Sequence, residues 1–260
     1  MTMIYQVLRY RDLLRMMIWR DIRVKYKQSV LGVMWAVLMP ATIVLAGLVV
    51  RFAMSKVSGK PMAAEDIANV SVRAVPWAFF VASLRFGASC LVANPNLVTK
   101  IYFPKVIFPL SATLSQFIDF LISCCVLAII LVALGLSPSL NLLWLPLLVV
   151  ILVILAAGMA IFLSAASLFF RDVKYLVEMI LTFAIFFTPV FFDASLFGEW
   201  KNLLLLNPVA PILEGISSIV VGRGGVDPGW LLYSGVVALM VFCGSLAFFE
   251  RLEPLFAESI

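Results

Sequence analysis

Long apolar stretches constrain this chain more than any other feature. One of them, Leu140–Phe170, runs 31 residues without a charged side chain, and about 20 predominantly apolar residues let a helix cross the hydrocarbon core of a bilayer. Hydrophobic residues make up 64% of the 260 residues and charged residues 13%, so there is too little polar surface to cover a globule in water. The sequence therefore predicts an all-α, polytopic integral membrane protein.

The apolar stretches predict six membrane-spanning helices. They are Val30–Val50, Val75–Val92, Val106–Leu136, Leu140–Phe170, Tyr175–Phe192 and Trp230–Phe249. The fourth is longer than one crossing needs, so we expect it to tilt, bend or extend beyond the interface. Leu203–Val221 is also apolar, but Pro208, Pro211 and Glu214 interrupt it. Because proline breaks helix interiors, two short re-entrant helices on the outer side are expected there, between spans five and six.

Basic residues predict the orientation. Twelve Lys and Arg side chains fall in the N-terminal region, the loops after the second and fourth spans, and the C-terminal tail, against six on the opposite side. Since cytoplasmic flanks carry the excess of Lys and Arg, both termini are expected in the cytoplasm. We expect a cytoplasmic N-terminal amphipathic region (1–29), a six-helix transmembrane domain (30–249) and a cytoplasmic tail (250–260).

The residues before the first span have the pattern of an amphipathic helix. Tyr10, Leu13, Leu14 and Met17 fall on one arc of a helical wheel, with charged residues opposite. This predicts a short helix along the cytoplasmic interface that ends near Arg20, where the pattern fails. The helix is either a simple positive-inside anchor or a docking surface for a partner.

The residue inventory excludes several kinds of chemistry. There is no histidine, and the four cysteines lie in apolar runs without the spacing of metal ligands, so we expect no catalytic residue and no metal site. The glycine-rich ATP-binding loop that ends in Lys and Ser or Thr is absent. Energy must therefore come from an ion gradient or from another polypeptide. A net charge of +5, concentrated in membrane flanks, does not indicate nucleic-acid binding.

Arg85 and Asp119 are the ionisable residues predicted deep inside spans, where charges are costly and often functional. A pair between them, linking the second and third spans, is one interpretation. Helix–helix hydrogen bonds, or a position near an interface, are the other. Two such residues are too few to favour a proton pump or a cation-coupled carrier.

Aromatic residues in the fifth span mark a candidate passage. Phe183, Phe187, Phe191 and Phe192 surround Thr188-Pro189. Such rings usually face lipid or pack between helices. The alternative is a passage whose flat, apolar ring faces contact sugar rings and let a long glycan slide past.

The loop between the second and third spans, Asn94–Lys105, has turn-forming residues at its start and Pro104 near its end. Between them is room for two helical turns that expose apolar and basic side chains to the cytoplasm. The segment is either an interfacial link or a small helix that projects into another protein.

Several stretches resemble the transmembrane subunit of ABC-2 type exporters for cell-surface polysaccharides, the permeases for O-antigen, capsule and teichoic acid. In family order they are Trp19–Gly32 with Trp35 and Pro40, Asn94–Pro109, Phe170–Tyr175, Thr188–Val190, and Asn207-Pro208 with Glu214-Gly215. The likeness covers the chain from residue 19 to about residue 215. Met39 departs from the pattern, because a polar Gln is expected before the proline of the first span.

The resemblance implies a homodimeric permease that works with two copies of a separate ATP-binding subunit. ATP and Mg would bind to that partner, so no cofactor is expected in this chain. The cargo would be an undecaprenyl-diphosphate-linked polysaccharide, exported across the cytoplasmic (inner) membrane of a bacterium. The chain itself would contact membrane lipid. The predicted substrate-pathway residues are Trp35, Arg85, Phe183, Phe187, Phe191 and Phe192. The predicted residues for coupling to the ATPase are Arg20, Arg23, Asn96, Lys100, Tyr102 and Lys105.

Two other functions stay open. One is an integral membrane enzyme that acts on lipid-linked sugars, which needs clustered carboxylates or a basic phosphate site. The outer-side carboxylates Asp193, Glu199, Glu214 and Asp227 are its candidates, and they are dispersed along the sequence. The other is an ABC-2 exporter of a small lipid or drug.

Overall fold

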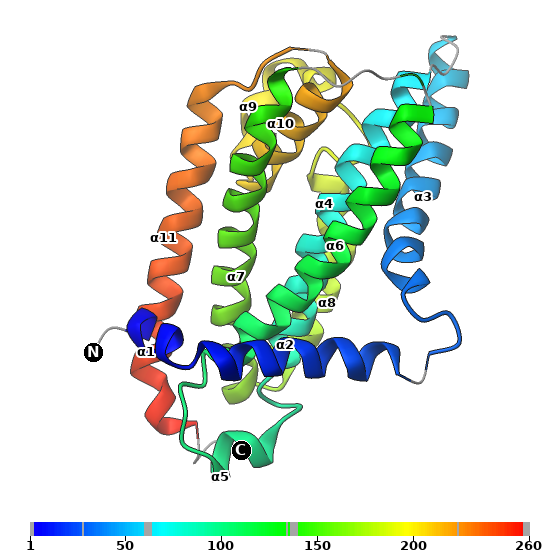
Figure 1. The fold of residues 1–260 in the computed structure, drawn as a ribbon. Coiled ribbons are helices and arrows are strands. Elements are labelled where there is room, and N and C mark those ends of the chain that lie inside the picture. Colours follow the sequence, from blue (N-terminus) through cyan, green and yellow to red (C-terminus); the bar gives the residue numbers. More distant parts are fainter. Residues whose placement is uncertain are drawn as a thin grey trace.

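The structure is a computed structural model that describes residues 3–27, 29–59, 64–133, 135, 140–222 and 224–256. Within these ranges the chain forms helices and no strand. Five helices there are long and apolar enough to cross a membrane: α3 (Met34–Ser58), α4 (Ala64–Ser89), α6 (Ile107–Ala133), α7 (Leu145–Phe169) and α11 (Pro228–Leu252). The predicted all-α polytopic fold is confirmed, and Figure 1 shows these helices connecting two ends of the molecule.

The second span begins earlier than predicted. We expected Val75, whereas α4 starts at Ala64 and includes the charged residues Asp66 and Arg73. The helix continues through them because both are paired, Asp66 with Arg51 and Arg73 with carboxylates from other elements.

The long fourth apolar stretch divides into two pieces. A 3₁₀ segment, η1 (Leu140–Trp144), precedes α7, and Pro146 lies in the first turn of α7, where proline is tolerated. The predicted excess length is thus taken up before the spanning helix begins. The end of the predicted third span, residues 134 and 136, lies outside the described residues.

The predicted fifth span, Tyr175–Phe192, is not one continuous helix. α8 (Asp172–Ala184) has 13 residues, and η2 (Ile185–Phe187) adds one turn before the backbone becomes extended at Thr188. Pro189 is the cause, since the residue before a proline avoids the helical conformation. α8 is therefore shorter than a full crossing needs, and the count of six spans stays a prediction.

Short helices gather at one end of the bundle. They are η3 (Ala194–Trp200), α9 (Lys201–Leu205) and α10 (Val209–Val221). The two short helices predicted for Leu203–Val221 are confirmed, and they are separated at Asn207-Pro208. Figure 1 shows α9 and α10 at the upper end, opposite to α2 and α5.

The other end carries α1 (Met3–Arg9), α2 (Arg11–Tyr26), α5 (Pro95–Lys100) and η4 (Glu253–Leu255). In Figure 1, α2 lies across the ends of the long helices, and the first and last described segments lie at this same end. Residues 1, 2, 28 and 257–260 of the predicted terminal regions lie outside the described residues.

The predicted amphipathic helix is confirmed in α2. Its apolar arc, centred on buried Met17, packs against Ile107 and Phe108 at the start of α6. The prediction that it ends near Arg20 was wrong, because α2 continues to Tyr26. The charges that broke the pattern are paired: Arg20 lies 2.8 Å from the Asp21 carboxylate.

Candidate functional site

The two ionisable residues predicted inside the spans are paired, but not with each other. Asp119 of α6 accepts hydrogen bonds from the Lys25 ammonium and from the Tyr26 hydroxyl, both in the last turn of α2. Lys25 also donates to Gln116 Oε1 at 3.1 Å. Of the two interpretations, the Arg85–Asp119 pair is therefore wrong, because α2 lies against α6 and places Lys25 at Asp119.

Arg85 of α4 pairs with α8 instead. Its Nε lies 2.8 Å from Glu178 Oε1, and the two side chains are 43% and 39% exposed. Charges are expensive in hydrocarbon unless they face protein or water. This open pair therefore indicates that the flank of α4 and α8 borders a polar space or another protein surface.

A cavity of about 540 Å³ lies between α2, α3, α4, α6 and α8. Its wall combines the charged side chains of Lys25, Arg85 and Asp119 with the aromatic rings of Trp35 and Trp77. Sites for ligands typically combine a concave apolar surface with a few convergent polar groups. Two predicted substrate-pathway residues, Trp35 and Arg85, are thus brought together in this cavity.

The four predicted pathway phenylalanines do not line this cavity. Phe183 and Phe187 lie exposed on α8 and η2, and Phe187 is 71% exposed. Phe191 is buried, and its ring packs so closely on Gly47 of α3 that an added methyl group would come within 2.7 Å. The Phe192 ring packs on Phe197, with centroids 4.9 Å apart. Only the first two are placed to contact a passing molecule.

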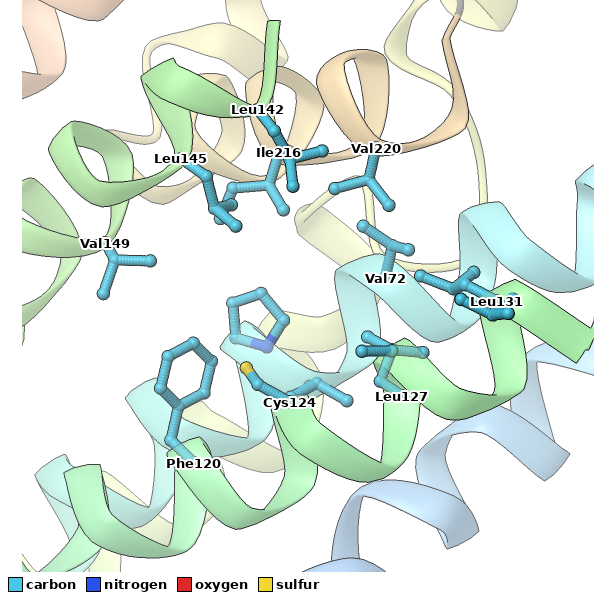
Figure 2. A pocket seen from close by; sticks show the side chains of 14 residues that line it. Val72, Phe120, Cys124, Leu127, Leu131, Leu142, Leu145, Val149, Ile216 and Val220 are labelled. Atoms are coloured by element: carbon cyan, nitrogen blue, oxygen red, sulfur yellow. The ribbon is translucent and has the colours of Figure 1, made fainter. Parts of the chain in front are cut away.

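A second cavity, of about 210 Å³, lies nearer the opposite end, between α4, α6, α7 and α10. Figure 2 shows Val72, Phe120, Leu145 and Ile216 around it, and the Cys124 sulfur among them. None of its described lining residues is charged. Its lining therefore offers hydrophobic contacts and no charged partner for a polar molecule.

An ionic network at the α10 end gathers charges that are dispersed along the sequence. Arg73, only 3% exposed, places Nη2 2.6 Å from Asp193 Oδ1 and 3.1 Å from Glu214 Oε2. Arg51 lies 3.1 Å from Asp193 Oδ2 and 3.2 Å from Asp66 Oδ1. Burial raises the pKa of Asp193, but the two guanidinium groups outweigh burial and hold that pKa below its ordinary value.

This network weighs against an enzymatic site at the carboxylates that the sequence predicts on the outer side. Asp193 and Glu214, which are dispersed along the sequence, lie close together in the structure, yet both are paired with arginine. A sugar-processing site needs carboxyl groups free to exchange protons or attack. No group of three or more cysteine, aspartate or glutamate side chains in the described ranges is arranged to hold a metal ion.

Part of the predicted coupling surface is exposed. Asn96 and Lys100 of α5 lie open, and Tyr102, just after it, is 98% exposed. Arg23 is also exposed and lies over the Trp19 ring, 5.2 Å from its centroid. These residues lie on α2 and around α5 at the same end of the bundle, where another protein can reach them.

The other predicted coupling residues have internal partners. The Lys105 ammonium lies 4.4 Å from the centroid of the Phe103 ring, and burial lowers its pKa. The Lys105 backbone N–H donates to Glu253 Oε1 at 2.7 Å, and Arg20 donates to Asn94 Oδ1 at 3.3 Å. Lys105 and Arg20 therefore hold the two ends of the α5 segment, a role that sequence reasoning missed.

Comparison with known proteins matches these features to one family. Residues 12–221 match the family described as ABC-2 type transporter. The chain is 26% identical to "O-antigen export system permease protein RfbA" of Myxococcus xanthus over 99% of both chains. It is 27% identical to a protein of the same name from Klebsiella pneumoniae, over 95% of this chain and 94% of that one. The matched residues run from α2 to the end of α10, so the chain belongs to the ABC-2 type transporter family, the transmembrane subunits of ABC exporters.

Proposed function

We propose that this chain is the permease of a bacterial exporter that carries an undecaprenyl-diphosphate-linked O-antigen or related polysaccharide across the cytoplasmic membrane. The observation that carries the proposal is the likeness, over nearly the whole chain, to proteins named as O-antigen export permeases. The absence of an ATP-binding loop from the sequence fits a permease driven by another subunit.

The partner in this proposal is an ATP-binding subunit, present in two copies and holding the ATP and Mg. Its contact surface is the end that carries α2 and α5, with exposed Lys100 and Tyr102 at its centre. This end would face the cytoplasm, which agrees with the excess of Lys and Arg in the N-terminal region and in the α5 loop. The α10 end would then face outward.

A second copy of the chain would complete the path. The half-exposed Arg85–Glu178 pair and the exposed rings of Phe183 and Phe187 lie on α4, α8 and η2. Lipid is an unfavourable neighbour for the ion pair. A homodimer whose copies face each other across this flank would give the pair a polar surrounding and place the rings beside the cargo.

A deletion strain tests the function. Loss of the chain should abolish surface polysaccharide and leave lipid-linked glycan inside the cell, and a plasmid copy should restore export. The matched control is a strain that keeps this chain but carries a hydrolysis-deficient ATPase partner. It should show the same export defect. Unchanged surface polysaccharide would refute the proposal, and so would turnover of a lipid-linked sugar donor by the purified chain without an ATPase.

A further inference from the structure

Arg73 connects α4 to two other elements. Its Nη1 donates to the carbonyl of Phe192 at 2.6 Å, and its Nη2 contacts the carboxylates of Asp193 and Glu214. The side chain is almost fully buried, so these groups take the place of water. Hydrogen bonds between guanidinium and carboxylate are among the strongest in proteins, and the flat fork of arginine holds its partners in a fixed direction.

The partners of Arg73 are also tied to each other and to α4. Glu214 of α10 accepts a second hydrogen bond, at 2.7 Å, from the backbone N–H of Ala194. One turn further along α10, Ser217 donates to Asn69 Oδ1 of α4 at 2.6 Å. Residues three or four positions apart lie on one face of a helix. Asn69 and Arg73 therefore present one face of α4 to Glu214 and Ser217 on one face of α10.

Hydrophobic packing between α4 and α10 is interrupted beside these contacts. Val72 of α4, next to Arg73, and Ile216 and Val220 of α10 line the apolar cavity of about 210 Å³. Figure 2 shows the three side chains around the open space. Packing is incomplete at this cavity, although Val72, Ile212 and Ile216 belong to one buried hydrophobic cluster. The polar contacts therefore add to the hydrophobic connection between the two helices.

Arg51 does not perform the same task. Its recorded ion pairs are with Asp66 and Asp193, and it has none with Glu214 of α10. Without Arg73, Asp193 would keep its ion pair with Arg51, whereas Glu214 would lose its own ion pair. Loss of Arg73 would therefore remove the ionic attraction between α10 and α4 and leave only the hydrogen bonds of Glu214 and Ser217.

We propose that Arg73 is a positioning residue that fixes α10 and residues 192–194 to α4, so that they move as one body while cargo passes. The export part of this inference rests on the proposed function. It implies that the outer end opens without separation of α10 from α4.

A cross-linking measurement tests the attachment without any cargo. The four natural cysteines, which form no disulfide in the structure, are replaced by serine, and Asn69→Cys and Ser217→Cys are introduced on the two helices. Both positions are only 1% exposed, so a small membrane-permeant oxidant, copper phenanthroline, is used, and it should join the two thiols rapidly in a disulfide because they already lie in contact. Adding Arg73→Gln should slow cross-linking at least tenfold, whereas adding Lys56→Gln, an exposed control on α3, should not. An unchanged rate with Arg73→Gln overturns the proposal.

A second variant keeps the proposal testable if Arg73→Gln does not fold. Arg73→Lys keeps the charge but replaces the fork by a single ammonium that cannot hold all three partners. Cross-linking in this variant should also slow, by several-fold, and an unchanged rate again overturns the proposal.

Export by the cross-linked protein tests the one-body movement. The cross-linked Asn69→Cys/Ser217→Cys protein should export polysaccharide as well as the same protein after reduction. Export that is lost on cross-linking and regained on reduction would show that α10 leaves α4, and would overturn the inference. If the natural chain itself exports nothing, the proposed function fails, while the cross-linking rates still decide the role of Arg73.

Discussion

Asp119 shows how a single buried charge attaches α2 to the bundle. It lies in the spanning helix α6 and receives both Lys25 and Tyr26 from α2. Burial raises the pKa of Tyr26 well above its ordinary value, and the hydrogen bond to Asp119 raises it further, so the phenol stays a donor. Sequence reasoning found Asp119 but not its partners, because Lys25 is 94 positions away and no periodicity relates the two.

We predict that Asp119→Asn lowers the thermal stability of the detergent-solubilised protein more than Lys25→Gln does, because it weakens two contacts. Removing one partner of a fully buried pair costs about 3–5 kcal/mol. Because Lys25 is only half-buried, we expect about 1–2 kcal/mol for its loss, and a double-mutant cycle should show coupling. Additive effects of the two substitutions would contradict a direct interaction.

Lys100 and Lys105 should respond differently to charge reversal. Lys100→Glu changes an exposed side chain and should uncouple ATP hydrolysis from export while leaving membrane insertion and stability intact. Lys105→Glu places a carboxylate beside Glu253, which contacts the Lys105 backbone, and should also lower stability, by about 1 kcal/mol. Export assays and melting curves of both variants check this. Normal export with Lys100→Glu would remove it from the coupling surface.

At the scale of elements, the break after α8 and η2 separates the predicted pathway residues into exposed and buried ones. The apolar length of Tyr175–Phe192 suggested one span, but Pro189 ends the helix and the backbone becomes extended at Thr188. Phe187 stays exposed before the break, while Phe191 is buried after it. The sequence identified the aromatic cluster but could not separate these two, since the separation depends on contacts with α3.

Phe187→Ala and Phe191→Ala should therefore affect different properties, export and stability respectively. Phe187→Ala should slow export of long glycans several-fold with little change in stability, because its ring packs against little else. Phe191→Ala should destabilise the protein by about 3–5 kcal/mol, since it leaves a cavity against Gly47. Surface-polymer length profiles and thermal melts provide the measurements. A normal profile with Phe187→Ala would contradict its place in the path.

The contact between α7 and α11 depends on a small residue. A Cβ atom at Gly158 of α7 would lie 2.8 Å from the Phe242 Cα of α11, and a backbone atom cannot rotate away. Small residues permit such close approach of helices in membranes. We predict that Gly158→Val destabilises the protein by about 2–3 kcal/mol, measured by melting. Gly244→Val on α11, where an added Cβ meets nothing within 4 Å, is the matched control and should have a smaller effect.

For the whole molecule, the sequence predicted the parts that follow from local pattern. Apolar length gave the five long helices, and proline positions gave the short helices α9 and α10. Contacts between distant residues could not be predicted. Arg73 lay just before the predicted second span, because nothing in the sequence shows that Asp193 and Glu214 neutralise it. Glu253 showed no motif, yet it holds the base of the α5 segment.

These contacts tie both ends of the molecule to its long helices. At the α5 end, Arg20 joins the exposed segment to α2, and Glu253 joins it to η4, which directly follows α11. At the α10 end, Arg73 joins the short helices to α4. A push on α5 by an ATP-binding partner would therefore reach the long helices directly, as a driven permease requires.

Reconstitution tests this dependence on a partner most directly. Vesicles that contain the chain, its ATP-binding subunit and a lipid-linked polysaccharide should transport the polysaccharide when ATP is added. Vesicles with the chain alone should show neither transport nor ATP hydrolysis. Transport without the ATP-binding subunit, or ATP hydrolysis by the purified chain, would contradict the account.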